Sequence, residues 1–79
     1  MRAAAQKQGR GGAITLAGEV MASLLATELF EQAIGHGPKT ALGRAWIAGS
    51  AGVIRHRLEQ GDTFDEIRAT MEVALGIRR

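Results

Sequence analysis

A short segment of this chain is similar to the end of a phosphate-binding loop. The segment is residues 35–40, Gly-His-Gly-Pro-Lys-Thr. A true loop follows the pattern GxxxxGK[ST] after a strand, because its backbone N–H groups hold the phosphates. Here Ala33 and Pro38 occupy the two glycine positions, and proline has no N–H to donate. The segment is therefore predicted to be a turn between two helices.

A serine among small residues is similar to the nucleophile elbow G-x-S-x-G. It is Ser50, within residues 48–52 (Ala-Gly-Ser-Ala-Gly). The elbow exposes its serine on a strained turn between a strand and a helix of a large α/β sheet. A chain of 79 residues cannot hold such a sheet. Ser50 is therefore expected to be a small residue at a contact between helices, and no catalytic residue is predicted.

The two histidines offer little for metal chemistry. His36 and His56 lie twenty residues apart, without an HExxH or other paired-ligand spacing. The chain has no cysteine, which removes thiol nucleophiles, disulfides and cysteine zinc sites together. We therefore expect no metal and no cofactor. His36 is expected to face solvent in its turn, and His56 to lie on a helix as a pH-sensitive contact.

Six side chains are better suited to binding a partner than to catalysis. Glu28 falls inside the main apolar arc of its helix, so it must reach solvent at the rim or pair with a cation such as Arg55 or Arg57. Trp46, the only tryptophan, is either the centre of the core, which we favour, or an anchor at an interface. The candidates for partner binding are Glu28, Arg44, Trp46, Arg55, His56 and Arg57.

Apolar periodicity predicts the helices that would position these side chains. The first is expected from Ala13 to Ile34, and the last begins with a capping box between Thr63 and Glu66. The apolar residues of the first helix that share the arc expected to face the core are Ile14, Ala17, Val20, Met21, Leu24, Leu25 and Leu29. Those of the last helix are Phe64, Ile67, Met71, Ala74 and Leu75.

The helix predicted over residues 38–60, with Pro38 at its first position, is apolar on two sides. One face carries Leu42, Trp46, Gly49 and Val53, and the other carries Ile47, Ala51, Ile54 and Leu58. Small residues recur every four positions, which lets another backbone approach closely. Such a helix is central in the bundle or shared with a partner, so we expect a homodimer or an interface for a target. A break at residues 49–52 is the alternative to one continuous helix.

The charges separate the ends of the chain from its body. The net charge is +2 and the isoelectric point about 9.9, yet five of the ten basic side chains lie in the tails. Residues 14–77 hold five basic and eight acidic side chains, a net charge of −3. We expect residues 1–12 to be a mobile basic tail and residues 13–79 a single domain. The longest apolar stretch is interrupted by glutamates, so we expect no membrane span and a cytoplasmic protein.

These observations favour a compact all-α bundle of three helices, with a fourth as the alternative. We expect it to dimerise and to bind a protein target stoichiometrically, without enzyme activity. Inhibitors and adaptors of phages and other mobile elements, anti-CRISPR proteins among them, have this size, although no residue pattern carries a family resemblance. The alternative is a nucleic-acid-binding accessory protein that uses Arg55 and Arg57 together with the tail residues Arg2, Lys7, Arg10, Arg78 and Arg79.

Overall fold

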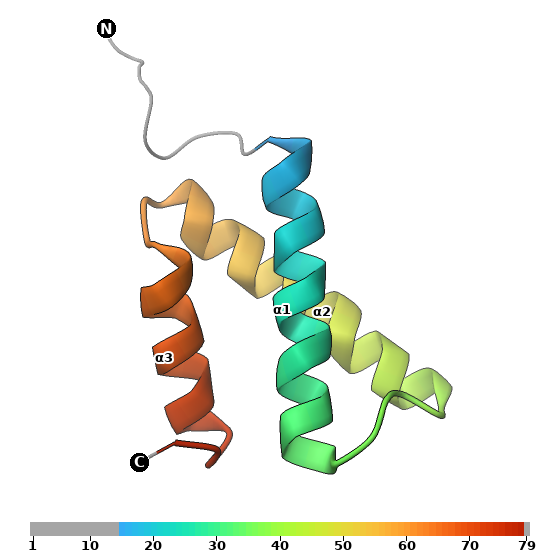
Figure 1. Cartoon of the computed structure of the whole chain (residues 1–79). Coiled ribbons are helices and arrows are strands. Elements are labelled where there is room, and N and C mark those ends of the chain that lie inside the picture. The colour runs from blue at the N-terminus through green and yellow to red at the C-terminus, as the bar shows by residue number, and fades with distance from the viewer. Residues whose placement is uncertain (1–14, 79) are drawn as a thin grey trace, which may run out of the picture.

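The computed structural model describes residues 15–78, and over this range the chain is all-helical. The helices are α1 (Leu16–Ile34), α2 (Ala41–Glu59) and α3 (Phe64–Ala74), with no strand and no fourth helix in the described part (Figure 1). In this view α1 and α3 run side by side in the same direction, and α2 crosses obliquely behind them. The all-α bundle is thus confirmed. The tail predicted for residues 1–12 lies outside the described residues.

A threonine begins each helix. The hydroxyl oxygens of Thr15, Thr40 and Thr63 each accept a hydrogen bond from the backbone N–H three residues later, at 3.0–3.1 Å. At the third helix the Glu66 carboxylate also accepts from the Thr63 N–H at 2.8 Å, so the predicted capping box is confirmed. The cap at Thr40 corrects the position predicted for Pro38. A threonine hydroxyl can satisfy a free N–H, so α2 starts after Thr40 and Pro38 stays in the loop.

Glycines in the left-handed region follow the first two helices. Gly35 has φ 95° and Gly61 has φ 101°, a conformation that costs other residues much more. Between these two glycines α2 is one unbroken helix from Ala41 to Glu59. The continuous helix is therefore confirmed, and the alternative break at residues 49–52 is not found.

The core contains one large, fully buried side chain from each helix: Leu29, Ile54 and Ile67. On α1 the other buried residues are Ala22, Leu25 and Ala26. Partly buried side chains from α2, α3 and the C-terminal segment surround this cluster: Trp46, Ile47, Ala51, Leu58, Phe64, Met71, Leu75 and Ile77.

The face of α1 that turns inward is only partly the predicted one, since Leu25 and Leu29 are buried as expected. Val20, Met21 and Leu24 were expected in the core, but each is about half exposed. Ala22 and Ala26, one turn apart, are buried instead. Because alanine is short, the neighbouring helices can approach α1 closely along this side, and the larger side chains are left outside.

The two apolar faces of α2 have different environments. Ile54 is buried, and Ile47, Ala51 and Leu58 pack against the core, as one predicted face requires. On the opposite side Leu42 is 80% exposed and Val53 is 54% exposed. On that second face Trp46 packs against the core, whereas Leu42 and Val53 remain largely in water.

Candidate docking surfaces

The largest group of exposed apolar side chains lies on α1. Leu16, Val20, Met21 and Leu24 recur at helical spacing over the first half of the helix, and each is 48–77% exposed. We call these four residues the α1 outer face. Large exposed apolar patches on soluble proteins mark binding surfaces, so this face is a candidate docking surface.

The charges on α1 are all acidic. Glu19, Glu28 and Glu31 are its only charged residues, and Glu19 lies among the outer-face residues, in a hollow that also involves Ser23. The α1 outer face is therefore an apolar surface with an acidic border. It suits an apolar partner that carries basic side chains around the contact.

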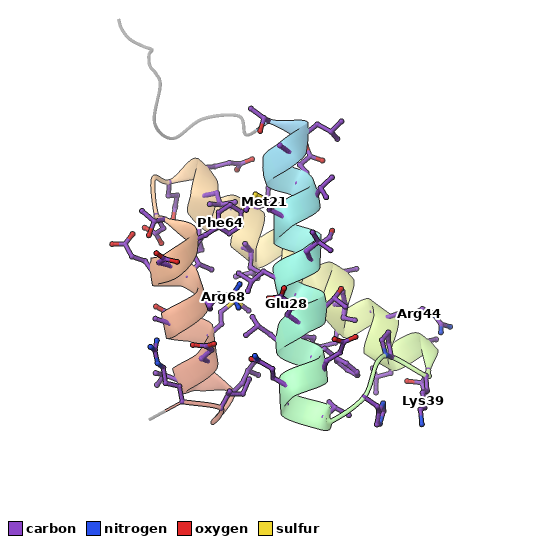
Figure 2. All side chains as sticks on the ribbon, viewed as in Figure 1. Met21, Glu28, Lys39, Arg44, Phe64 and Arg68 are labelled. Carbon is purple, nitrogen blue, oxygen red and sulfur yellow. The ribbon has the colours of Figure 1, made fainter. Side chains whose placement is uncertain are left out.

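The outer face continues into a groove between α1 and α3. Met21 and Leu24 line one wall of this groove and Phe64 lines the other. The groove has a volume of about 270 Å³. Figure 2 shows Met21 and Phe64 together near one end of the two helices, and Glu28 and Arg68 facing each other farther along.

Glu28 pairs with a different cation from the ones expected. Its carboxylate lies 3.1 Å from the Arg68 guanidinium of α3, and not beside Arg55 or Arg57 (Figure 2). Glu28 stands on the side of α1 that borders α3, which places it out of reach of the basic residues of α2. Both side chains stay about half exposed, so Glu28 is a rim residue with a partner.

A pocket of about 400 Å³ lies where the end of α1 meets the start of α2. The rings of Phe30 and Trp46 lie with their centroids 5.8 Å apart and tilted by 53°. We call this the Trp46 pocket. Its lining residues are Phe30, Ala33, Ile34, His36, Lys39, Thr40, Leu42, Gly43, Trp46 and Leu75.

Trp46 packs against the core, the role that we favoured for it, and also borders the pocket. Its side chain is half-buried. Leu42 lies on the same predicted face as Trp46, yet it is 80% exposed. Leu42 therefore contributes no buried side chain to the core.

The remaining candidate residues are not gathered into one patch. Arg44, Arg55 and His56 are exposed on α2, and Figure 2 shows Arg44 projecting from the start of that helix and Lys39 from the loop before it. The His56 Nδ1 lies 3.9 Å from a Glu59 carboxylate oxygen.

Arg57 has a structural partner. Its Nε donates a hydrogen bond to the Asp62 carboxylate at 2.7 Å and so fastens the turn between α2 and α3. This engagement makes Arg57 a weaker candidate for contacting a partner than the sequence suggested.

The basic residues proposed for nucleic-acid binding are mostly beyond the described range. Arg2, Lys7, Arg10 and Arg79 lie outside residues 15–78. Arg78 lies 3.5 Å from the Glu72 carboxylate, so its charge is partly compensated.

The motifs that were similar to catalytic or metal sites in the sequence have a different setting in the structure. Ser50 lies in the middle of a continuous helix and not on the turn that a nucleophile elbow needs. His36 is exposed in the loop, where its Nδ1–H donates to the Gly37 carbonyl oxygen at 2.6 Å. Within residues 15–78 no three His, Asp or Glu side chains lie close enough to share a metal ion, and no helix is both long and apolar enough to cross a membrane.

Comparison with known proteins returns no match among family models, curated proteins or solved structures. The surfaces just described therefore carry the functional argument.

The α1 outer face was missed from the sequence because three of its four residues, Val20, Met21 and Leu24, were assigned to the core. One signal could have separated the two sides of the helix. Ala22 and Ala26 form a short-side-chain strip next to Leu25 and Leu29, and such a strip allows close packing between helices.

Proposed function

We propose that this chain is a non-enzymatic module that binds a protein target stoichiometrically. The observation that carries the proposal is the α1 outer face, four large apolar side chains about half or more exposed on one side of a helix. When a partner covers exposed apolar surface, the complex is stabilised by roughly 25 cal/mol per Å² removed from water. A helix face is also a common unit of recognition between proteins.

The acidic border of this surface favours a protein partner over a polyanion. Glu19 and Glu31 stand on the same helix as the apolar residues, and α1 has no basic residue to offset them. Phosphates would be repelled at this position, whereas basic side chains around an apolar contact would be attracted.

The proposal includes a homodimer formed through α2. Its exposed side carries Leu42, Ala45, Gly49 and Val53, which we call the α2 outer stripe. The stripe carries no charge, and it lies on the opposite side of α2 from the core. Two copies meeting through this stripe would form a symmetric contact, the commonest kind in soluble dimers, and would leave both α1 outer faces free.

The setting we propose is the cytoplasm, with a target inhibited or recruited by direct contact. We propose an inhibitor or adaptor of a phage or another mobile element.

The test is capture of a target by the tagged protein and by two matched variants. Val20→Asp places a carboxylate on the α1 outer face, and Val73→Asp places one on α3 at a residue of similar exposure, 56% against 51%. We expect Val20→Asp to lose a discrete protein that the parent chain and Val73→Asp both retain. Equal helicity of the two variants by circular dichroism confirms that the loss comes from the surface. Equal capture by both variants would contradict a role for this face.

The same capture experiment distinguishes binding to a protein target from binding to a nucleic acid. The observation that favours the nucleic-acid alternative is the exposure of Arg44 and Arg55 on α2, neither of which forms an ion pair among the described residues. Material held through phosphate contacts should disappear with nuclease treatment and in salt of about 0.5 M. A protein partner held by the α1 outer face should survive both.

A further inference from the structure

The Trp46 pocket plays no part in the proposed docking through α1, and Leu42 is the one residue that it shares with the α2 outer stripe. Its apolar walls come from three parts of the chain: Phe30 and Ile34 at the end of α1, Leu42 and Trp46 at the start of α2, and Leu75 after α3. Its volume of about 400 Å³ falls in the range of sites that hold small molecules, roughly 300–1,000 Å³.

The walls of the pocket suit an alkyl chain. Ile34 and Leu42 line it while remaining 53% and 80% exposed, so part of its apolar surface is in water. The Phe30 and Trp46 rings supply two further apolar surfaces. A flexible hydrocarbon chain could cover this surface and remove it from water.

One edge of the pocket is positively charged. The ionisable side chains that line it are His36 and Lys39, both in the loop between α1 and α2, and no acidic residue of the described chain lines it. Thr40, the cap of α2, is also part of the lining, so the positive end of the helix dipole lies at the same edge. Glu31 approaches this loop at Gly37 but does not line the pocket.

We propose that the Trp46 pocket binds a free medium-chain fatty acid. The alkyl chain lies against Phe30, Ile34 and Trp46, and the carboxylate lies at the edge formed by Lys39. An apolar cavity with a cationic edge matches this ligand in both shape and charge, since the apolar body fixes the position and the charge selects the head group.

The fluorescence of Trp46 reports directly on this pocket, because it is the only tryptophan of the chain. The probes are decanoate and decylammonium, which share a chain length and carry opposite charges, each titrated below its micelle concentration. We expect decanoate to shift the emission to shorter wavelength as it displaces water from the ring. The change should saturate at one molecule per chain, and decylammonium should bind more weakly.

Two pairs of variants locate the ligand. Lys39→Gln should weaken decanoate about two- to fivefold, the factor that one exposed charge pair supplies, while Arg44→Gln should not. Arg44 is a matched control because it is an exposed base in the first turn of α2, close in sequence to Lys39, and does not line the pocket. Ile34→Glu places a carboxylate in the pocket wall and should weaken decanoate more than Lys39→Gln does. Val20→Glu, at a residue of nearly equal exposure on the same helix, should have no effect.

Several results would overturn the proposal. They are an unsaturable response or none, decylammonium binding as tightly as decanoate, and equal effects within either pair of variants. The decanoate titration and the target-capture experiment test two separate proposals. Val20→Glu should abolish capture and spare decanoate, and Ile34→Glu should do the reverse.

Discussion

The three glycines inside α2 offer a matched set of substitutions. Each costs about 1 kcal/mol of helix propensity relative to alanine. A Cβ added at Gly49 or Gly52 would meet nothing within 4 Å, whereas a Cβ at Gly43 would lie 3.2 Å from Phe30 Cζ. We therefore expect Gly49→Ala and Gly52→Ala each to raise the free energy of unfolding by about 1 kcal/mol.

The third substitution should not give this gain. The Phe30 ring would have to move by a few tenths of an ångström to admit a Cβ at Gly43. It is packed between Trp46, at 5.8 Å between centroids, and His36, at 6.5 Å. Overpacking costs about 1–3 kcal/mol, and although the ring also borders the Trp46 pocket, the cost is expected to cancel or exceed the gain in propensity. Gly43→Ala is therefore expected to be neutral or destabilising.

Thermal unfolding followed by circular dichroism measures all three variants. For a chain of this size, 1 kcal/mol changes Tm by about 4–8 °C, so the expected increases are well above experimental error. The measurement should be made at low protein concentration, where the proposed dimer is dissociated. At high concentration Gly49→Ala and Gly52→Ala should instead weaken self-association, because Gly49 belongs to the α2 outer stripe and Gly52 adjoins it.

The reasoning would be refuted if Gly49→Ala or Gly52→Ala lowered Tm in the dilute protein. That result would mean that the space beside these glycines is occupied in the single chain. A Tm increase for Gly43→Ala as large as for the other two would likewise show that Phe30 does not press on this helix. If Tm is independent of protein concentration for the parent chain, the proposed dimer is wrong.

Three further substitutions test the core, a cap and an ion pair. Leu29 is fully buried, so Leu29→Ala should lower the free energy of unfolding by about 2–5 kcal/mol. Leu42 is 80% exposed, so Leu42→Ala should change it by less than about 0.5 kcal/mol. Urea unfolding measures both variants. Thr63→Ala removes a hydroxyl that accepts at 3.1 Å and should cost about 1 kcal/mol in the same assay, with Thr63→Ser as the control that keeps the cap. Glu28→Gln should cost less than about 1 kcal/mol because the Arg68 pair is about half exposed, and a larger loss at high salt would contradict this reading.

The helix boundaries could be predicted well where a local signal sets them. Thr63 and Glu66 form their capping box within four residues, and Gly61 ends α2 through its own backbone conformation. Both features depend on neighbours in sequence, so the sequence contains what determines them. The start of α2 was misplaced because both Pro38 and Thr40 are suitable N-terminal residues, and the hydroxyl cap decided between them.

The direction in which α1 faces could not be predicted in the same way. Periodicity shows that apolar residues share an arc, but α1 has apolar residues on both sides. Whether Ala26 or Leu24 turns inward depends on how closely α2 and α3 approach, and that distance is a property of the whole bundle. The Trp46 pocket was missed for the same reason, since Phe30, Trp46 and Leu75 are far apart in sequence and meet only where α1, α2 and the end of α3 come together.

The size of the core explains why so much apolar surface remains outside. Three helices in two layers have few inward-facing positions, and only three large side chains are fully buried: Leu29, Ile54 and Ile67. The single chain therefore gains little stability from the α1 outer face, and Val20→Asp should barely change its unfolding. Exposed apolar residues at helical spacing promote association in water, which disfavours them on a chain that acts alone. Their contribution to stability is expected only in a complex, where a partner removes them from water.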